Sequence, residues 1–195
     1  MEDEFGPYKF INIGSNSPCV IKMRFIPSNG DLKEFWLTET VLTEEQVHNV
    51  YKTSFSSDYP CINLGIHYLP DLIKNIQKNS NDNSITIPTQ EQWEYAARAN
   101  NQPNSYIPID DYSWNYMNAH GKFHSVGTKK PNSWGLYDML GNTWQLTFYN
   151  RKQYHGQPTY ILCGGDVNSV ELNFAKRKDL SFHTHCYFSI RLCSF

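Results

Sequence analysis

The sequence predicts a single α+β domain, rich in loops, with small antiparallel sheets and about three helices. Three observations support this fold class. Short N-terminal segments alternate apolar and polar side chains, as half-buried strands do. Three other segments begin with a capping residue or Pro and continue with apolar side chains at helical spacing. Finally, residues 125–144 carry many large apolar side chains without either period, which is typical of a loop packed onto a core.

The first predicted elements form a hairpin. Residues 21–25 alternate apolar and basic side chains, and Glu34–Val41 contains a second apolar strand pattern. Ser28–Asp31 has the composition of the turn between them.

Helix signals follow. Thr43 and Gln46 have the spacing of a capping box, and so do Thr89 and Gln92. Pro70 suits the first turn of a helix between these two. We therefore expect three helices, each with an apolar face toward the core.

The C-terminal half is predicted to be less regular. Asn100–Asp111 is a connection rich in Pro and Asn. Two short segments follow the apolar loop, at Gln145–Asn150 and Thr159–Cys163, and a last strand is expected near Tyr187–Cys193. No internal repeat, linker or second domain is visible, so we expect one domain over residues 1–195.

Composition excludes several classes of protein. A net charge of −2 on 195 residues argues against nucleic acid or an anionic membrane as partner. The acidic start is unlike a signal peptide, and no apolar run reaches the length of a membrane span. Five cysteines without a CxxC motif predict free thiols in a reducing compartment. We expect a cytoplasmic or phage-virion location.

Two long motifs and three short ones carry a family resemblance. They are IPTQEQWEYAARA (Ile87–Ala99), SVGTKKPNSWGLYDMLGNTW (Ser125–Trp144), Cys163–Asp166, Ala175–Arg177 and Ser189–Arg191. Over about residues 35–193 the chain resembles the formylglycine-generating enzyme, or sulfatase-modifying-factor, family. The resemblance implies a C-type-lectin-like fold, which hosts both enzymes and binding proteins.

The resemblance also identifies what the chain lacks. The family's copper-dependent oxidases need two cysteines soon after the Gly-Gly-Ser turn, whereas Gly164–Arg177 contains none. We therefore predict a non-catalytic protein without copper. Two alternatives stay open: an oxidase using Cys163 or Cys186, and a silent paralogue that regulates a true family enzyme. The His183 and His185 pair is not expected to bind metal.

Calcium is the one cofactor that the resemblance leaves open. By position, the family's calcium ligands correspond to the Asp138 carboxylate, the Gly141 and Thr143 backbone oxygens, and Gln145. Gln145 replaces a glutamate, so one negative charge is lost and a weak site or none is expected. Asp138 and Asn142 can instead bond to the backbone of the turn.

The C-terminal region suggests a binding role. Retroelement-diversified variable proteins, which are similar to this family, vary between the Gly-Gly motif and a terminal motif, here Asp166–Tyr187. Adaptable polar and aromatic residues in that window predict a surface for a protein or glycan ligand. Oligomeric state is not predicted. The expected contact residues are Asp166, Asn168, Asn173, Phe182, His183, His185 and Tyr187, with Trp114 and Tyr116 as neighbours.

Overall fold

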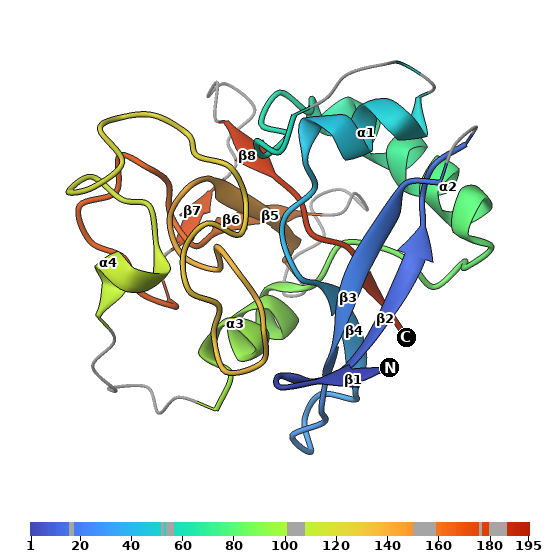
Figure 1. The fold of residues 1–195 in the computed structure, drawn as a ribbon, viewed down its shortest axis with the longest axis horizontal. Coiled ribbons are helices and arrows are strands. Elements are labelled where there is room, and N and C mark those ends of the chain that lie inside the picture. Colours follow the sequence, from blue (N-terminus) through green and yellow to red (C-terminus); the bar gives the residue numbers. More distant parts are fainter. Residues whose placement is uncertain are drawn as a thin grey trace.

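The computed structural model describes residues 1–15, 18–51, 53, 57–100, 108–149, 159–175, 177–179 and 187–195. Within them the chain forms nine short strands, four α-helices and one 3₁₀ turn. The fold is α+β, with two small sheets separated by long loops (Figure 1).

The first sheet contains five antiparallel strands in the order β1-β2-β3-β4-β9. Its strands are β1 (Glu2–Asp3), β2 (Gly6–Asn12), β3 (Val20–Ile26), β4 (Phe35–Thr38) and β9 (Cys193–Ser194). The sheet therefore contains both ends of the chain, with β1 at one edge and β9 at the other (Figure 1). Helices α1 (Glu44–Val50) and α2 (Leu69–Ser80) pack against each other, and α2 also contacts β2.

The second sheet has the order β7-β6-β5-β8. Its strands are β5 (Trp144–Phe148), β6 (Tyr160–Cys163), β7 (Arg177–Asp179) and β8 (Phe188–Ser189). The β5–β8 pair is parallel, while the other pairs are antiparallel. Helix α3 (Gln90–Arg98) packs on β5 and β6. The short α4 (Ile109–Tyr112) and η1 (Ile66–Tyr68) complete the fold.

The core has two parts. One lies between the first sheet and the α1–α2 pair, where Leu72 and Ile76 of α2 are fully buried. The other surrounds Trp93 of α3 and includes Leu136, Met139 and Leu140 of the apolar loop. The loop predicted to pack down therefore contributes directly to the core.

Each of the three predicted helices is present, and local signals explain why. The Thr43 and Thr89 side chains accept hydrogen bonds from the backbone amides of Gln46 and Gln92. In turn, the side-chain oxygens of Gln46 and Gln92 accept from the backbone amides of Thr43 and Thr89. Pro70 occupies the first turn of α2.

Three details of the sequence prediction were wrong. The expected strand at Tyr187–Cys193 is two separate strands, β8 and β9, because the chain crosses there from one sheet to the other. The N-terminal hairpin of β1 and β2 was missed, since Pro7 and the consecutive acidic residues Glu2–Glu4 obscure its period. The short helix α4 (Ile109–Tyr112) begins within the predicted connection Asn100–Asp111 and extends one residue beyond it. In the described parts of the chain, no helix is long and apolar enough to cross a bilayer.

Candidate functional site

The Gly141-Asn142 pair joins the loops that surround the candidate site. The Asn142 amide donates to the Trp114 carbonyl at 2.7 Å, and its own carbonyl accepts from Val167. Its side chain pairs with both backbone groups of His124, at 3.0 and 2.9 Å. One buried asparagine thus holds residues 113–128 and residues 165–170 together.

Gly141 permits the close approach that this junction needs. Its φ is +74°, and a Cβ there would lie 2.2 Å from the Trp114 carbonyl oxygen. Only glycine satisfies both constraints. Gly135, in the middle of the apolar loop, also has positive φ, and a Cβ there would lie 2.6 Å from Arg24 Nε.

A buried polar network lies beneath these loops. Gln145 Oε1 accepts hydrogen bonds from Trp93 Nε1 at 2.8 Å and from Arg191 Nε at 2.7 Å. Arg191 also donates to the carbonyls of Thr38, Glu39 and Tyr137. Burial lowers the pKa of Arg191 to about 10, so it remains a cation at neutral pH. The network ties both sheets to the loop.

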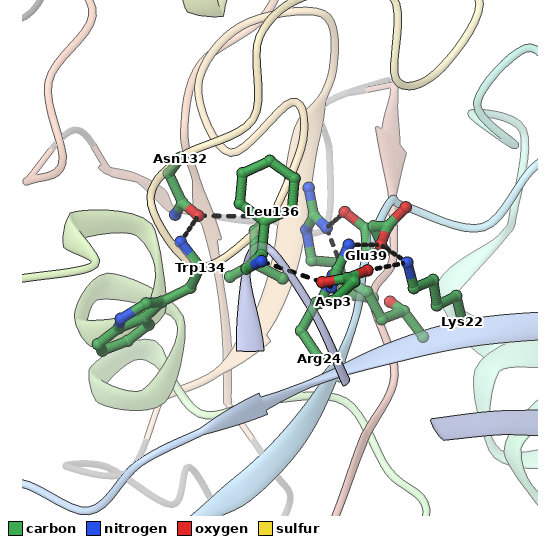
Figure 2. Close-up of polar contacts among 10 residues, drawn as sticks. Asp3, Lys22, Arg24, Glu39, Asn132, Trp134 and Leu136 are labelled. Carbon is green, nitrogen blue, oxygen red and sulfur yellow. Dashed lines mark hydrogen bonds and ion pairs between the residues drawn. The ribbon is translucent and has the colours of Figure 1, made fainter. Parts of the chain in front are cut away.

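Figure 2 shows two clusters of polar contacts, one around Arg24 and one around Asn132. Arg24 of β3 is buried and forms ion pairs with Asp3 and Glu39, both at 2.6 Å. Asn132 Oδ1 accepts from the amides of Trp134 and Leu136. Asn132 also donates to the Ala96 carbonyl of α3, and the Tyr137 amide donates to the Glu39 carbonyl just after β4, so this part of the loop is held to α3 and to the first sheet.

Two loops form one exposed surface. The Tyr116 amide donates to the Ser169 carbonyl at 3.2 Å, which places Tyr116 beside the 166–170 turn. The turn is closed by Asp166, whose Oδ1 accepts from the Asn168 amide and from Ser169 Oγ. Tyr187 contacts the first of these loops through Phe123: the centroids of the two rings are 5.9 Å apart, and the rings meet edge-on.

Large apolar and aromatic side chains point outward from these loops. Exposed fractions are 61% for Tyr116, 71% for Met117, 70% for Val170 and 57% for Tyr187, and Asn168 is also exposed. We call these five residues the loop surface.

Of the other predicted contact residues, two lie within the described part of the chain and three lie outside it. Trp114 is half-buried: its ring stacks on His124 at 3.7 Å, and its Nε1 donates to Thr128. Asn173 is exposed, and its Oδ1 accepts from the Ala175 amide. The predicted contacts Phe182, His183 and His185 lie outside the described residues. Met117 and Val170 were not predicted, because single apolar residues in loops carry no periodic signal.

The candidate calcium residues are engaged with one another and with the backbone. Asp138 Oδ2 accepts from the Gly127 amide, Gly141 O accepts from the Thr143 amide, and Gln145 Nε2 donates to the Asp138 carbonyl. Gln145 does not offer a free oxygen to a cation, because its Oε1 already accepts from the Trp93 and Arg191 side chains, whereas Asp138 Oδ1 has no hydrogen-bond partner among the described residues. Within the described residues, no cluster of three His, Cys, Asp or Glu side chains is arranged for metal binding.

The described cysteines are buried or half-buried thiols. Cys163 is fully buried, and burial raises its pKa. Burial also raises the pKa of Cys193 to about 12. Neutral thiols are poor copper ligands and poor nucleophiles. Cys186 lies outside the described residues.

The comparisons with known proteins agree with this architecture. The model of the sulfatase-modifying factor enzyme 1-like domain matches residues 72–186, which is more than half of the chain. The chain belongs to this family. No curated protein sequence matches it significantly.

Three solved structures share the fold. Treponema denticola variable protein 1 has a TM-score of 0.77 at 17% identity, covering 96% of this chain and 98% of that one. PvdO from Pseudomonas aeruginosa has a TM-score of 0.67 at 12% identity, covering 96% and 91%. CarF has a TM-score of 0.68 at 16% identity, covering 96% and 97%. The predicted formylglycine-generating-enzyme-like, C-type-lectin-like fold is thereby confirmed, and identities this low indicate the fold alone.

Proposed function

We propose that this protein is a non-catalytic ligand-binding module whose loop surface captures a protein or glycan ligand. The observation that carries the proposal is the combination of exposed aromatic and apolar side chains with loops held by buried hydrogen bonds. Neighbouring exposed side chains of this kind are typical of interaction sites in soluble domains.

The loop surface suits binding for an energetic reason. Tyrosine offers a large contact area with few rotatable bonds, so little side-chain entropy is lost on contact. The loops beneath are already fixed by Asn142 and by the Asp166 turn, which lowers the ordering cost further. Asn168 adds an amide that can donate and accept at the same surface.

The chemistry of the sulfur atoms supports a non-catalytic role. Residues 164–177 contain no cysteine, although the family's oxidases place their copper ligands in this region. Cys163 is the nearest thiol in the chain before them, and its burial favours the neutral form. An oxidase that uses Cys163 would therefore need a rearranged β6.

The similarity to a variable protein supports the location of the surface. Treponema denticola variable protein 1 shares the fold over almost the whole chain. Asp166, Asn168 and Tyr187 fall in the window where retroelement-diversified relatives are expected to vary. We propose the same use of the window here.

Alanine substitutions at the loop surface test the proposal. The wild-type protein is screened on glycan and protein arrays, and each positive ligand is re-measured with Tyr116→Ala and Tyr187→Ala variants. We expect each substitution to weaken binding by about 1–2 kcal/mol, or about 5- to 30-fold, as for aromatic residues in the centre of an interface.

Tyr68→Ala is the matched control. Tyr68 is 65% exposed, close to the 61% of Tyr116, but it lies at the end of η1. This variant should bind like the wild type. If Tyr68→Ala weakens binding while Tyr116→Ala and Tyr187→Ala do not, the loop surface is not the ligand site.

A further inference from the structure

The polar side chains beneath the loop surface already have partners inside the protein. Asn115 Oδ1 accepts from the Met117 amide, and its Nδ2 donates to Asp110 Oδ1 at 2.8 Å. Asn118 Oδ1 accepts from the Asn115 amide, and its Nδ2 donates to the Ser113 carbonyl at 3.0 Å. Both side-chain amides therefore hold the first loop in shape, with donor and acceptor engaged.

Neighbouring polar and aromatic groups are engaged as well. Asp166 Oδ1 accepts from the Asn168 amide at 3.1 Å. The Trp114 ring stacks on His124 with 3.7 Å between centroids, and Lys129 Nζ lies over the same ring, 4.2 Å from its centroid. Among the described residues of these loops, few polar groups or aromatic faces are therefore left for the hydroxyl groups and rings of a sugar.

The side chains that point outward have the opposite character. Met117 and Val170 are 71% and 70% exposed. Each directly follows one of the two residues that the hydrogen bond between Tyr116 and Ser169 joins, so both belong to the same part of the surface. None of the five residues of the loop surface carries a charge at neutral pH.

Met117 and Val170 discriminate between the two classes of ligand. A sugar carries hydroxyl groups on most of its ring carbons, and a hydroxyl buried against a methyl group or a thioether loses water without gaining a good hydrogen bond. An apolar segment of a protein is instead stabilised by burial there. Tyrosine and methionine are enriched in the centre of protein interfaces, where charged residues are depleted. Tyr116 and Tyr187 suit either class, so the two aliphatic side chains favour a protein.

We propose that the partner of the loop surface is a protein, which packs an apolar segment of its own against Met117 and Val170. This inference rests on the proposed function, because it names the partner class for the same surface.

A phage-displayed library of random peptides, screened beside a defined glycan array, tests the inference on the intact protein. We expect the wild type to retain peptides rich in apolar residues and to retain no glycan. Retained peptides are then synthesised and titrated against Met117→Ser and Val170→Ser variants whose circular dichroism spectra match the wild type. Each substitution should weaken binding at least about fivefold.

Val20→Ser is the matched control. Val20 is 52% exposed, but it lies in β3 of the first sheet. The same change of side chain at this position should leave the affinity for each peptide unchanged.

The outcomes separate this inference from the proposed function. Peptides that bind the Met117→Ser and Val170→Ser variants like the wild type, but bind Tyr116→Ala or Tyr187→Ala more weakly, would overturn the inference and leave the loop surface as the ligand site. A glycan that is retained in place of peptides, and that either tyrosine substitution weakens, would do the same. Retention of neither probe also overturns the inference. If none of the four substitutions weakens a retained ligand, the proposed function fails with it.

Discussion

Single residues with unusual backbone geometry position the loops of this fold. Asp138 and Asn142 both have positive φ, at +52° and +56°, and both use their side chains to hold backbone amides. Asparagine and aspartate tolerate this conformation better than other non-glycine residues. The motif GLYDMLGNTW therefore fixes the backbone conformation of the loop in addition to supplying core residues.

Gly141→Ala should be one of the most destabilising substitutions in these loops. The new Cβ would meet the Trp114 carbonyl at 2.2 Å, in addition to the strain of positive φ. We expect a loss of at least about 2 kcal/mol in unfolding free energy, measured by chemical denaturation. Gly30→Ala is the control, since it has φ of +95° but no atom within 4 Å of the new Cβ. Equal losses for the two variants would show that the close approach is unimportant.

We expect Gln145 to prevent a response to calcium. Because its oxygen accepts from Trp93 and Arg191, calcium should leave the wild-type melting temperature unchanged relative to a chelator. Gln145→Glu should be less stable than the wild type by about 1–3 kcal/mol without calcium, since a carboxylate oxygen would face the Asp138 carbonyl. A calcium-dependent rise in the wild-type melting temperature would contradict this prediction and support the weak calcium site that the family motif suggests.

At the scale of elements, helices were predictable and the C-terminal strands were not. Thr89 and Gln92 define the start of α3 by themselves, because a capping box acts within one turn. Strands β8 and β9 depend on partners more than forty residues away in the chain: β8 pairs with β5, and β9 pairs with β4. Their two-residue lengths leave no period to read.

In the candidate site, too, local features could be predicted from the sequence, whereas long-range contacts could not. Gly141 and Asn142 were visible as backbone signals, and the candidate contacts Asp166 and Asn168 do lie on one turn beside Tyr116. The pairing of Arg191 with Gln145 could not be foreseen, because it joins residues 46 positions apart through a fully buried contact.

The N-terminal hairpin should make stability depend on acid pH. Hydrogen bonds from Arg24 and Lys22 hold the pKa of Asp3 well below its ordinary value. A carboxyl with a lowered folded-state pKa contributes stability above its unfolded pKa, near 4, and that contribution is lost as pH falls through the folded-state value. Asp3→Asn should therefore destabilise the protein at neutral pH, and the difference from the wild type should shrink below about pH 4. Denaturation curves across this range measure it, and a difference independent of pH would contradict the role of the ion pair.

At the scale of the whole molecule, this protein shares its fold with solved structures to which its sequence identity is low. The structures of variable protein 1, PvdO and CarF match nearly the whole chain at 12–17% identity. Low identity is compatible with a shared fold because a core accepts many apolar sequences of similar volume. A shared architecture therefore does not determine activity, which depends on the residues of the site.

Site-specific photo-cross-linking tests the central claim most directly. A photoreactive phenylalanine analogue replaces Tyr187 in one sample and Tyr68 in another, and each is irradiated with a ligand found by the arrays. We predict a covalent adduct from position 187 and none from position 68, with both proteins folded. An adduct that forms only from position 68 would contradict a ligand site on the loop surface.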